Sequence, residues 1–253
     1  ATSRRSATAA DTAGAARRAR EGVRVARAWI GTSGWSYDHW AGVLYPHGLP
    51  PARRRDVYAA EFDTVELNAS FYRWPPATSF RAWGTRLSPG FRMAVKASRG
   101  LTHARRLYGP EPWVPRIAEA YRLLGDRGGP FLVQLDPRQE RDDARLDHFL
   151  SVLPPGVRAA LELRHPSWQH PDVWRILERH GAAYVVLSGA NLPCHLVATT
   201  DLVYLRLHGP SHTHLYAGSY SDADLGWWAD RIREWLGQGR EVYAYFNNDG
   251  EGH

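Results

Sequence analysis

The feature that most constrains the fold is a regular alternation of short apolar runs with helical patterns after residue 28. Apolar runs of strand length between helices are typical of parallel strands buried on both faces. Eight such runs, with no dinucleotide-binding glycine fingerprint after the first, predict an α/β fold of the TIM (β/α)8 barrel type. The expected strands are 28–33, 64–70, 91–98, 131–136, 157–164, 182–188, 202–209 and 240–249. The expected helices are 51–61, 78–87, 115–124, 142–153, 171–180 and 222–236.

Two places depart from the regular repeat. The connection at 189–201 is too short for a normal helix, and only a few residues follow the eighth strand before His253. We therefore expect a barrel that lacks its last helix. Either the sequence is a fragment or the barrel closes in an unusual way.

The basic character of the chain is concentrated in residues 1–27. This Ala/Arg-rich leader holds seven arginines against Asp11 and Glu21, a net +5 out of the chain's +6. Residues 28–253 are therefore nearly neutral, and we expect them to form one barrel domain. The leader is expected to be disordered or loosely helical and to lie outside the barrel. A solvated tail, an organellar transit peptide and a nucleic-acid-binding arm remain open for it. Any nucleic-acid affinity is expected to reside there.

Other features of the composition exclude whole classes of protein. No apolar stretch approaches the length of a membrane span, and the N-terminus has no apolar segment of a secretory signal. Cys194 is the single cysteine, so no intrachain disulfide can form. These features predict a cytoplasmic protein with no membrane partner.

Lys96 is the single lysine among 32 basic residues. Lysine differs from arginine because its compact amine can lose its proton when desolvated and can act as a base or nucleophile. Lys96 stands at the end of the run FRMAVKAS, where a barrel strand delivers side chains to the catalytic face. We predict that it is functional, is buried, and contacts Glu66 or Glu162.

The two-residue period of the strands brings polar side chains to the inside of the barrel. Their shared position at the carboxyl ends of strands predicts one polar pocket, built from Glu66, Asn68, Lys96, Gln134, Glu162, Arg164, His208 and Asn247. The catalytic candidates are Glu66, Lys96, Glu162 and His208. The ligand-binding candidates are Asn68, Gln134, Arg164, Arg206, Trp168, Tyr220, Asn247 and Asp249. Further aromatic residues expected near this face are Trp35, Tyr37, Trp40, Phe71, Tyr72, Trp74 and Tyr216.

Glu66 and Glu162 allow two interpretations. They can serve as the acid and base of a reaction such as glycoside hydrolysis, or each can be held in a salt bridge, and the two roles are compatible. A divalent metal bound by Glu66, Glu162, His208 and Asp249 is a weaker hypothesis, because Lys96, Arg164 and Arg206 already balance these acids. We therefore assign no metal ligand, and the cofactor remains unknown.

Several motifs also resemble a known family. They are IGTSGWSYDHWAG at 30–42, VELNASFYRWP at 65–75, AVKAS at 94–98, LELRHPSW at 161–168, RLHG at 206–209 and VYAYFNNDGEGH at 242–253. Over residues 29–253 the sequence resembles the domain of unknown function 72 family, the YecE-like proteins. The resemblance implies a TIM barrel and a site, but it implies little chemistry because the family has no settled activity.

These observations favour an enzyme, a hydrolase or isomerase, that acts by acid–base chemistry on a polar anionic or sugar-bearing small molecule. Lys96, Arg164 and Arg206 would bind its anionic part. Two alternatives remain: a nucleic-acid-binding phosphodiesterase or repair-type barrel, and a ligand-sensing barrel without catalysis. The near-neutral body counts against the nucleic-acid alternative.

Overall fold

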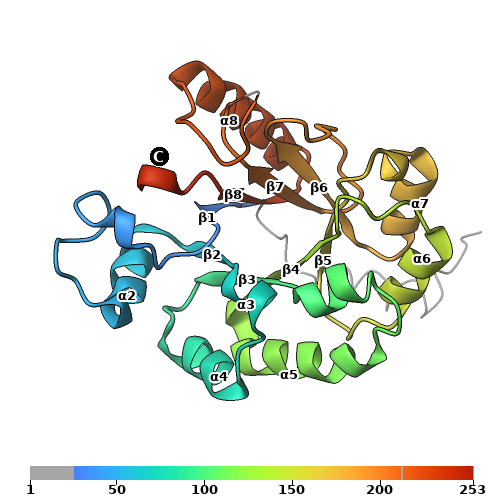
Figure 1. Cartoon of the computed structure of the whole chain (residues 1–253), viewed down its shortest axis with the longest axis horizontal. Coiled ribbons are helices and arrows are strands. Elements are labelled where there is room, and N and C mark those ends of the chain that lie inside the picture. Colours follow the sequence, from blue (N-terminus) through green and yellow to red (C-terminus); the bar gives the residue numbers. More distant parts are fainter. Residues whose placement is uncertain (1–25, 212, 253) are drawn as a thin grey trace, which may run out of the picture.

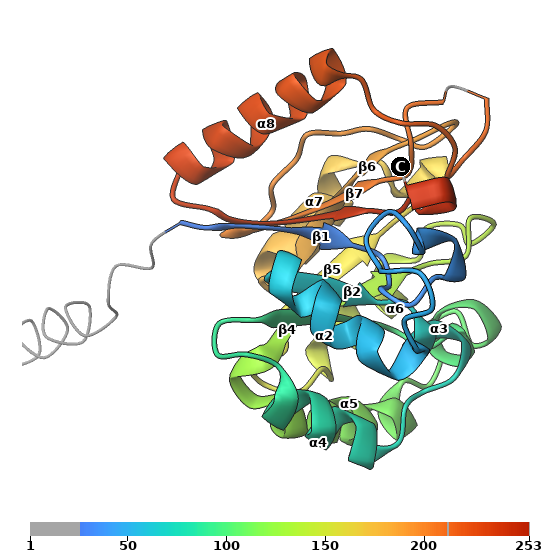
Figure 2. The same ribbon diagram turned by 90° about the vertical axis from the view of Figure 1, so that its left-hand side faces the viewer.

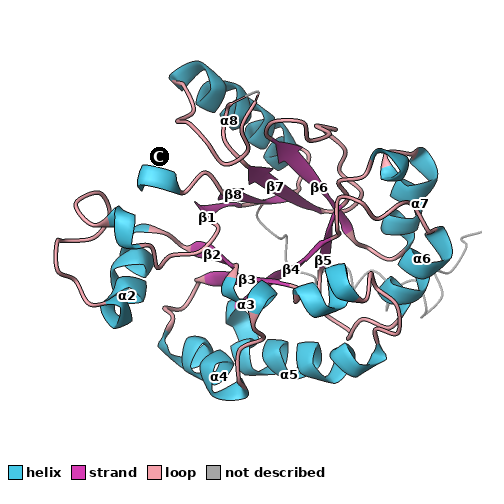
Figure 3. Ribbon diagram, in the orientation of Figure 1, coloured by secondary structure: helices cyan, strands magenta, loops and turns pink. Residues whose placement is uncertain are grey.

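The computed structural model describes residues 26–211 and 213–252, and its eight parallel strands form a ring surrounded by helices (Figures 1 and 3). The strands lie in the order β1-β8-β7-β6-β5-β4-β3-β2, which confirms the predicted TIM barrel. Their bounds are β1 Ala28–Thr32, β2 Thr64–Leu67, β3 Arg92–Lys96, β4 Gly128–Gln134, β5 Ala159–Glu162, β6 Ala183–Ser188, β7 Leu202–Leu207 and β8 Glu241–Phe246. The helices are α2 Pro51–Glu61, α3 Ala69–Tyr72, α4 Ala77–Arg86, α5 Val114–Leu124, α6 Asp143–Ser151, α7 Pro171–Arg179 and α8 Asp222–Gly237.

Local signals in the sequence set where the helices begin and end. Helix α2 starts with Pro51 at its first position, where the missing N–H costs nothing. Helix α8 starts with a capping box in which Ser221 and Asp224 satisfy each other's backbone N–H groups. Helix α5 ends at Gly125, whose φ of 53° is accessible to glycine without strain.

The strand alternation separates two apolar regions. The inside of the barrel holds Ala94, Leu132, Tyr204 and Tyr245 among others. The alternate side chains, such as Val95 on β3, pack outward against the helices. The phase predicted from the sequence is therefore confirmed, and it turns the polar side chains at the strand ends inward.

Helix α8 covers more of the barrel than one helix normally does. Residues 189–201 contain no helix, as the sequence predicts, so no helix separates β6 from β7. The indoles of Trp228 and Trp235 instead pack on outward side chains of β6, β7 and β8. Figure 2 shows α8 running alongside β8. A short 3-10 turn at Gly250–Gly252 follows β8.

The ring is completed between β1 and β2 by a seam rather than by a regular ladder. One isolated bridge joins Ser33 to Glu66, and Gly34 N donates to the Glu66 carbonyl at 2.8 Å. The Tyr58 hydroxyl of α2 bridges the two strands at the next position, because it accepts from Thr32 N at 2.9 Å and donates to the Thr64 carbonyl at 3.0 Å. The strands approach closely here, and a β-carbon at Gly31 would lie 2.3 Å from that carbonyl oxygen.

Most of the predicted strands extend one to three residues beyond the observed limits, and two of the differences have a clear local cause. The second strand ends at Leu67 rather than at residue 70, because Asn68 takes a helical conformation and leads into α3. The fourth strand begins at Gly128, three residues earlier than expected. Gly129 permits this start, since a β-carbon there would lie 2.9 Å from the backbone nitrogen of Ala94.

The predicted leader falls almost wholly outside the described residues, since these begin at residue 26. Arg27 already belongs to the barrel: its carbonyl accepts from Val242 N at 2.9 Å, and its guanidinium lies 4.0 Å from the Trp29 ring centroid. Within the described part of the chain, no helix is long and apolar enough to span a membrane.

Candidate functional site

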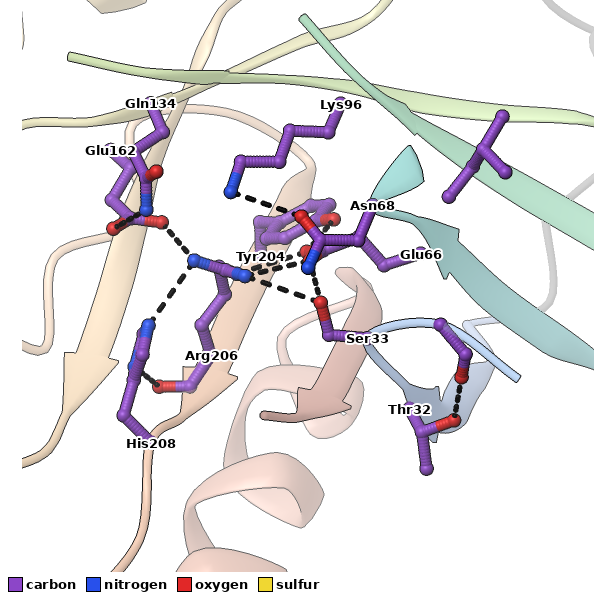
Figure 4. A network of polar contacts seen from close by, with 12 residues as sticks. Thr32, Ser33, Glu66, Asn68, Lys96, Gln134, Glu162, Tyr204, Arg206 and His208 are labelled. Carbon is purple, nitrogen blue, oxygen red and sulfur yellow. Dashed lines mark hydrogen bonds and ion pairs between the residues drawn. The ribbon is translucent and has the colours of Figure 1, made fainter. Parts of the chain in front are cut away.

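A buried arginine occupies the centre of the carboxyl-terminal end of the barrel (Figure 4). Arg206 on β7 has no exposed surface, and its guanidinium joins two carboxylates that are equally buried. Its Nε and Nη2 atoms bind the two oxygens of Glu66 at 2.9 and 2.7 Å, while Nη1 binds Glu162 at 2.6 Å. Glu66 and Glu162 are thereby cross-linked through one cation.

Further donors complete the coordination of Glu66. The Ser33 hydroxyl donates to Oε1 at 2.6 Å, and the Tyr204 hydroxyl donates to Oε2 at 2.7 Å. Each oxygen of Glu66 therefore accepts two hydrogen bonds, counting those from Arg206. These four hydrogen bonds hold the Glu66 carboxylate in one orientation.

Glu162 is held in a similar way. Its Oε1 accepts from Gln134 at 2.7 Å and from Arg164 Nε at 2.6 Å. Burial alone would raise the pKa of Glu162, but the positive charges of Arg164 and Arg206 outweigh it and hold that pKa well below its usual range. Glu162 is consequently an anion throughout the neutral pH range.

His208 lies beside the same network and is fully buried. Its Nε2 lies 3.1 Å from Arg206 Nη1 and 3.3 Å from Arg164 Nη2, while Nδ1 lies 3.3 Å from the Arg206 carbonyl. Two guanidinium donors directed at Nε2 require a lone pair there, so the proton is assigned to Nδ1. Burial, reinforced by Arg206, lowers the pKa of His208 to about 3. The ring is therefore neutral at physiological pH.

Lys96 is buried, as predicted, with 6% of its surface exposed. The prediction that it contacts Glu66 or Glu162 is wrong: within the described residues it forms no ion pair with a carboxylate. Its Nζ instead donates to Asn68 Oδ1 at 3.2 Å and lies 4.3 Å from the Phe71 ring centroid. The physical reason is that Arg206 already occupies the space between the two carboxylates.

The surroundings of Lys96 favour its neutral amine. Burial is the largest effect and the positive charge of Arg206 the next, and together they lower the pKa of Lys96 to about 8 despite opposing contributions from Glu66 and Glu162. An ordinary lysine is almost entirely protonated at pH 7. Lys96 is therefore expected to hold a larger fraction of free amine near neutral pH than an ordinary lysine does.

A cavity of about 970 Å³ lies over this end of the barrel. It is lined by Gly34, Trp35, Ser36, Tyr37, Leu67, Asn68, Ala69, Phe71, Tyr72, Trp83, Lys96, Arg99, His103, Gln134, Tyr216, Asn247 and Asp249. Five of the predicted catalytic and ligand-binding residues therefore line the same cavity: Asn68, Lys96, Gln134, Asn247 and Asp249. The volume suits a small polar ligand.

The other catalytic and ligand-binding candidates do not line the cavity, although the predicted aromatic residues Trp35, Tyr37, Phe71, Tyr72 and Tyr216 do. Glu66, Glu162, Arg164, Arg206 and His208 form the layer beneath it, through the contacts given above. Trp168 is 1% exposed and belongs to the outer apolar core, where its indole N–H donates to the Gln139 carbonyl at 2.7 Å. Tyr220 lies near β6 and β7, with its hydroxyl bound to Gly209 N and Ser188. Trp168 ends a short 3-10 turn and Tyr220 lies in the loop before α8, so strand phase gives neither side chain a direction.

The predicted site also lacked several residues that the fold brings in. Ser33 and Tyr204 complete the buried layer, and Tyr204 could have been found because it shares the inward phase of Arg206. Arg99 and His103 line the cavity from the loop after β3. That loop contains a turn of π-helix at Gly100–Ala104, which no periodic pattern in the sequence indicates.

The geometry gives no support to the metal hypothesis. Among the described residues no group of three or more His, Cys, Asp and Glu side chains is arranged to hold a metal ion. The oxygens of Glu66 and Glu162 already accept hydrogen bonds from Arg206 and its neighbours. A cation placed among them would have to displace a buried guanidinium.

Comparison with known proteins identifies the family. A model described as "Protein of unknown function DUF72" matches residues 29–253. The chain belongs to the DUF72 family. This confirms the resemblance seen in the sequence motifs.

Curated relatives and solved DUF72 structures agree with this assignment. The UPF0759 protein YunF of Bacillus subtilis (strain 168) is 24% identical over 88% of this chain and 89% of its own length. The UPF0759 protein YecE of Escherichia coli (strain K12) is 26% identical over 66% of this chain and 60% of its own length. A DUF72 crystal structure from Thermotoga maritima MSB8 is similar at a TM-score of 0.79 and 28% identity, covering 89% of this chain and 94% of that one. A second DUF72 crystal structure, from Enterococcus faecalis V583, is similar at a TM-score of 0.74 and 19% identity, covering 89% of this chain and 90% of that one.

The burial of Lys96 in this DUF72 barrel makes a prediction about stability. Because its folded-state pKa of about 8 lies below the ordinary 10.5, the fold disfavours the charged form. Lys96→Met is therefore expected to raise the free energy of unfolding at neutral pH by about 1–3 kcal/mol. The wild-type value should rise by itself as pH increases from about 8 toward 10.5.

Urea denaturation at neutral and alkaline pH measures both effects. Arg99→Met is the matched control, because it removes an exposed cation from the loop that follows β3 and should change stability by less than about 0.5 kcal/mol. A Lys96→Met protein less stable than wild type at neutral pH would contradict the prediction.

Proposed function

We propose that this DUF72 barrel is an enzyme that acts on a small, polar, anionic molecule by proton transfer, with Lys96 as the acid–base group. The observation that carries the proposal is the position of the Lys96 amine: it is buried, lacks a carboxylate partner within the described residues, and lines a cavity of about 970 Å³. A general base works best when its pKa lies near the working pH, and that of Lys96 is about 8.

The hydrogen bonds of the buried layer indicate that the other catalytic candidates, Glu66, Glu162 and His208, position Arg206 rather than contact the substrate. A carboxylate that accepts four hydrogen bonds, as Glu66 does, has no free lone pair directed at a substrate. Glu162 accepts three hydrogen bonds, both ring nitrogens of His208 have polar contacts, and neither residue lines the cavity. We therefore propose that Glu66, Glu162 and His208 fix Arg206, whose charge in turn keeps the Lys96 pKa low.

The cavity lining supports an anionic, hydroxylated substrate. Lys96, Arg99 and His103 come from β3 and the loop after it, so one wall carries cationic and N–H donor groups. Asn68, Gln134 and Asn247 provide amides, which bind hydroxyl groups as donors or acceptors. Aromatic side chains such as Trp35 and Tyr37 add flat apolar surface of the kind that packs on sugar rings.

The test is a screen of sugar phosphates, sugar acids and small hydroxy acids. Binding is followed by thermal unfolding, and conversion by proton NMR of the incubated mixture. We expect wild-type protein to convert at least one anionic compound, with a rate that rises as pH increases through about 8. Lys96→Met should lower the rate by about 100-fold or more while the protein stays folded.

Three outcomes would count against the proposal. Equal conversion by Lys96→Met would exclude Lys96 as the acid–base group. Binding without conversion would favour the ligand-sensing alternative. A steep salt dependence of DNA binding by a protein without residues 1–27 would favour the nucleic-acid alternative. Two further predictions stand untested: that the leader binds nucleic acid, and that the protein is cytoplasmic.

A further inference from the structure

Charged groups of both signs line the cavity from different segments of the chain. One side, after β3, presents Lys96, Arg99 and His103, whereas Asp249 lines the cavity from the segment after β8. Arg99 is exposed and forms no ion pair with any described carboxylate. Its charge is therefore available to a ligand rather than used within the protein.

Phe71 fixes the relation between the amine and its neighbours. Lys96 Nζ lies over the ring at 4.3 Å from the centroid, and the His103 ring meets Phe71 at 5.0 Å in an edge-to-face arrangement. His103 Nδ1 is engaged by the Thr102 hydroxyl at 2.9 Å, which leaves Nε2 as the ring atom available to a ligand. The amine and the imidazole therefore lie on adjacent parts of one wall, with the guanidinium of Arg99 on the same loop.

We propose that Lys96 forms an imine with the carbonyl carbon of a small oxo acid or of a phosphorylated aldehyde or ketone. Arg99 and His103 bind the anionic group of that substrate. This inference rests on the proposed function, since it assigns a covalent step to the same nitrogen and names the substrate class. Phe71 and Asn68 orient the amine: one N–H donates to Asn68 Oδ1, so the nitrogen lone pair is directed away from that amide.

The chemistry balances with groups already present. The amine lone pair attacks the carbonyl carbon, and one amine proton moves to the carbonyl oxygen to give a carbinolamine. The C–O bond then breaks as the C=N bond forms, and the oxygen leaves as water with the second amine proton. No oxidant or reductant takes part, and hydrolysis reverses the step.

The chain offers an unusually clean test because Lys96 is its single lysine. Sodium borohydride reduces an imine by adding hydride to its carbon, which leaves a stable secondary amine. We would incubate the wild-type chain with pyruvate and borohydride, and locate the adduct by intact mass and peptide mapping. The expected product is one 1-carboxyethyl group on Lys96 Nζ, resolved by the peptide map from any adduct at the terminal amine.

Matched probes and variants separate the two parts of the proposal. Hydroxyacetone has the same ketone but no charge, so it should label Lys96 about tenfold more slowly than pyruvate does. Arg99→Gln should slow labelling by pyruvate about tenfold and leave labelling by hydroxyacetone unchanged. His103→Gln should act in the same direction. Lys96→Arg keeps the charge and should give no adduct outside the amino terminus, and circular dichroism would verify its fold.

The failures are distinguishable. No adduct on Lys96 in the wild-type chain would overturn the imine. Equal labelling by pyruvate and hydroxyacetone, or no effect of Arg99→Gln, would overturn the anion subsite. Either result can occur while conversion of an anionic substrate still depends on Lys96, in which case the proposed function stands. An adduct on Lys96 together with no conversion of any anionic compound would support the imine and overturn the proposed function.

Discussion

Replacing Arg206 by methionine is expected to reduce the free energy of unfolding by about 3–5 kcal/mol, because buried Glu66 then loses its ion-pair partner and Glu162 keeps only Arg164. Glu66 and Glu162 have no exposed surface, so water cannot take the place of the guanidinium. Methionine approximates the volume of the lost side chain, so the main change is electrostatic. Urea denaturation at neutral pH measures the loss.

The matched control for this experiment is Arg233→Met. Arg233 forms a 2.6 Å ion pair with Asp230, but both side chains are largely exposed, and such a pair contributes about 0–1 kcal/mol. Arg206→Lys keeps one charge and should cost less than methionine, which provides a measurement if Arg206→Met does not fold. Equal effects of Arg206→Met and Arg233→Met would show that the buried ion pairs do not hold the barrel.

Acid is expected to destabilise the protein well before its carboxylates titrate, and His208 is the cause. Its pKa is about 3 in the fold and 6.5 in an unfolded chain, so below pH 6.5 the unfolded state binds a proton that the folded state rejects. Stability is therefore lost as pH falls, by about 1.4 kcal/mol per pH unit. Over the whole interval down to pH 3 this amounts to about 4–5 kcal/mol.

His208→Gln isolates this contribution, since glutamine does not titrate. The difference in unfolding free energy between wild type and His208→Gln should vary with pH between 6.5 and 3. His47→Gln, at an exposed position, serves as the control. Imidazole nitrogen NMR gives an independent check, because the ring should keep its proton on Nδ1 throughout the range. A His208 resonance that titrates near pH 6.5 would contradict the assignment.

The sequence was sufficient for the barrel and for the direction of its inward side chains. Strand phase depends on a two-residue period, and this period correctly turned Glu66, Lys96, Glu162, Arg206 and His208 toward the axis. The same reasoning could not rank their depths along that axis. Depth decides the pairing here: the long planar fork of Arg206 reaches both carboxylates, and Lys96 lies at the cavity above them.

Loop residues were the least predictable part of the site. Trp168, a predicted ligand contact, belongs to the core, whereas Arg99 and His103, which are absent from the predicted site, line the cavity. In both cases the side chain's direction depends on a short 3-10 or π turn whose geometry has no sequence period. Strand residues follow a simple rule, but loop residues follow the packing of whatever lies next to them.

The seam between β1 and β2 connects barrel closure to the arrangement of the site. Glu66 takes part in both, with its backbone in the bridge to Ser33 and its side chain bound by the Ser33 hydroxyl and by Arg206. Any breathing motion that parts the two strands must also release one of the contacts that orient the central guanidinium. Amide hydrogen exchange at Gly34 therefore reports on the contacts that orient Arg206 as well as on the pairing of β1 with β2. A ligand bound over Lys96 is expected to slow this exchange.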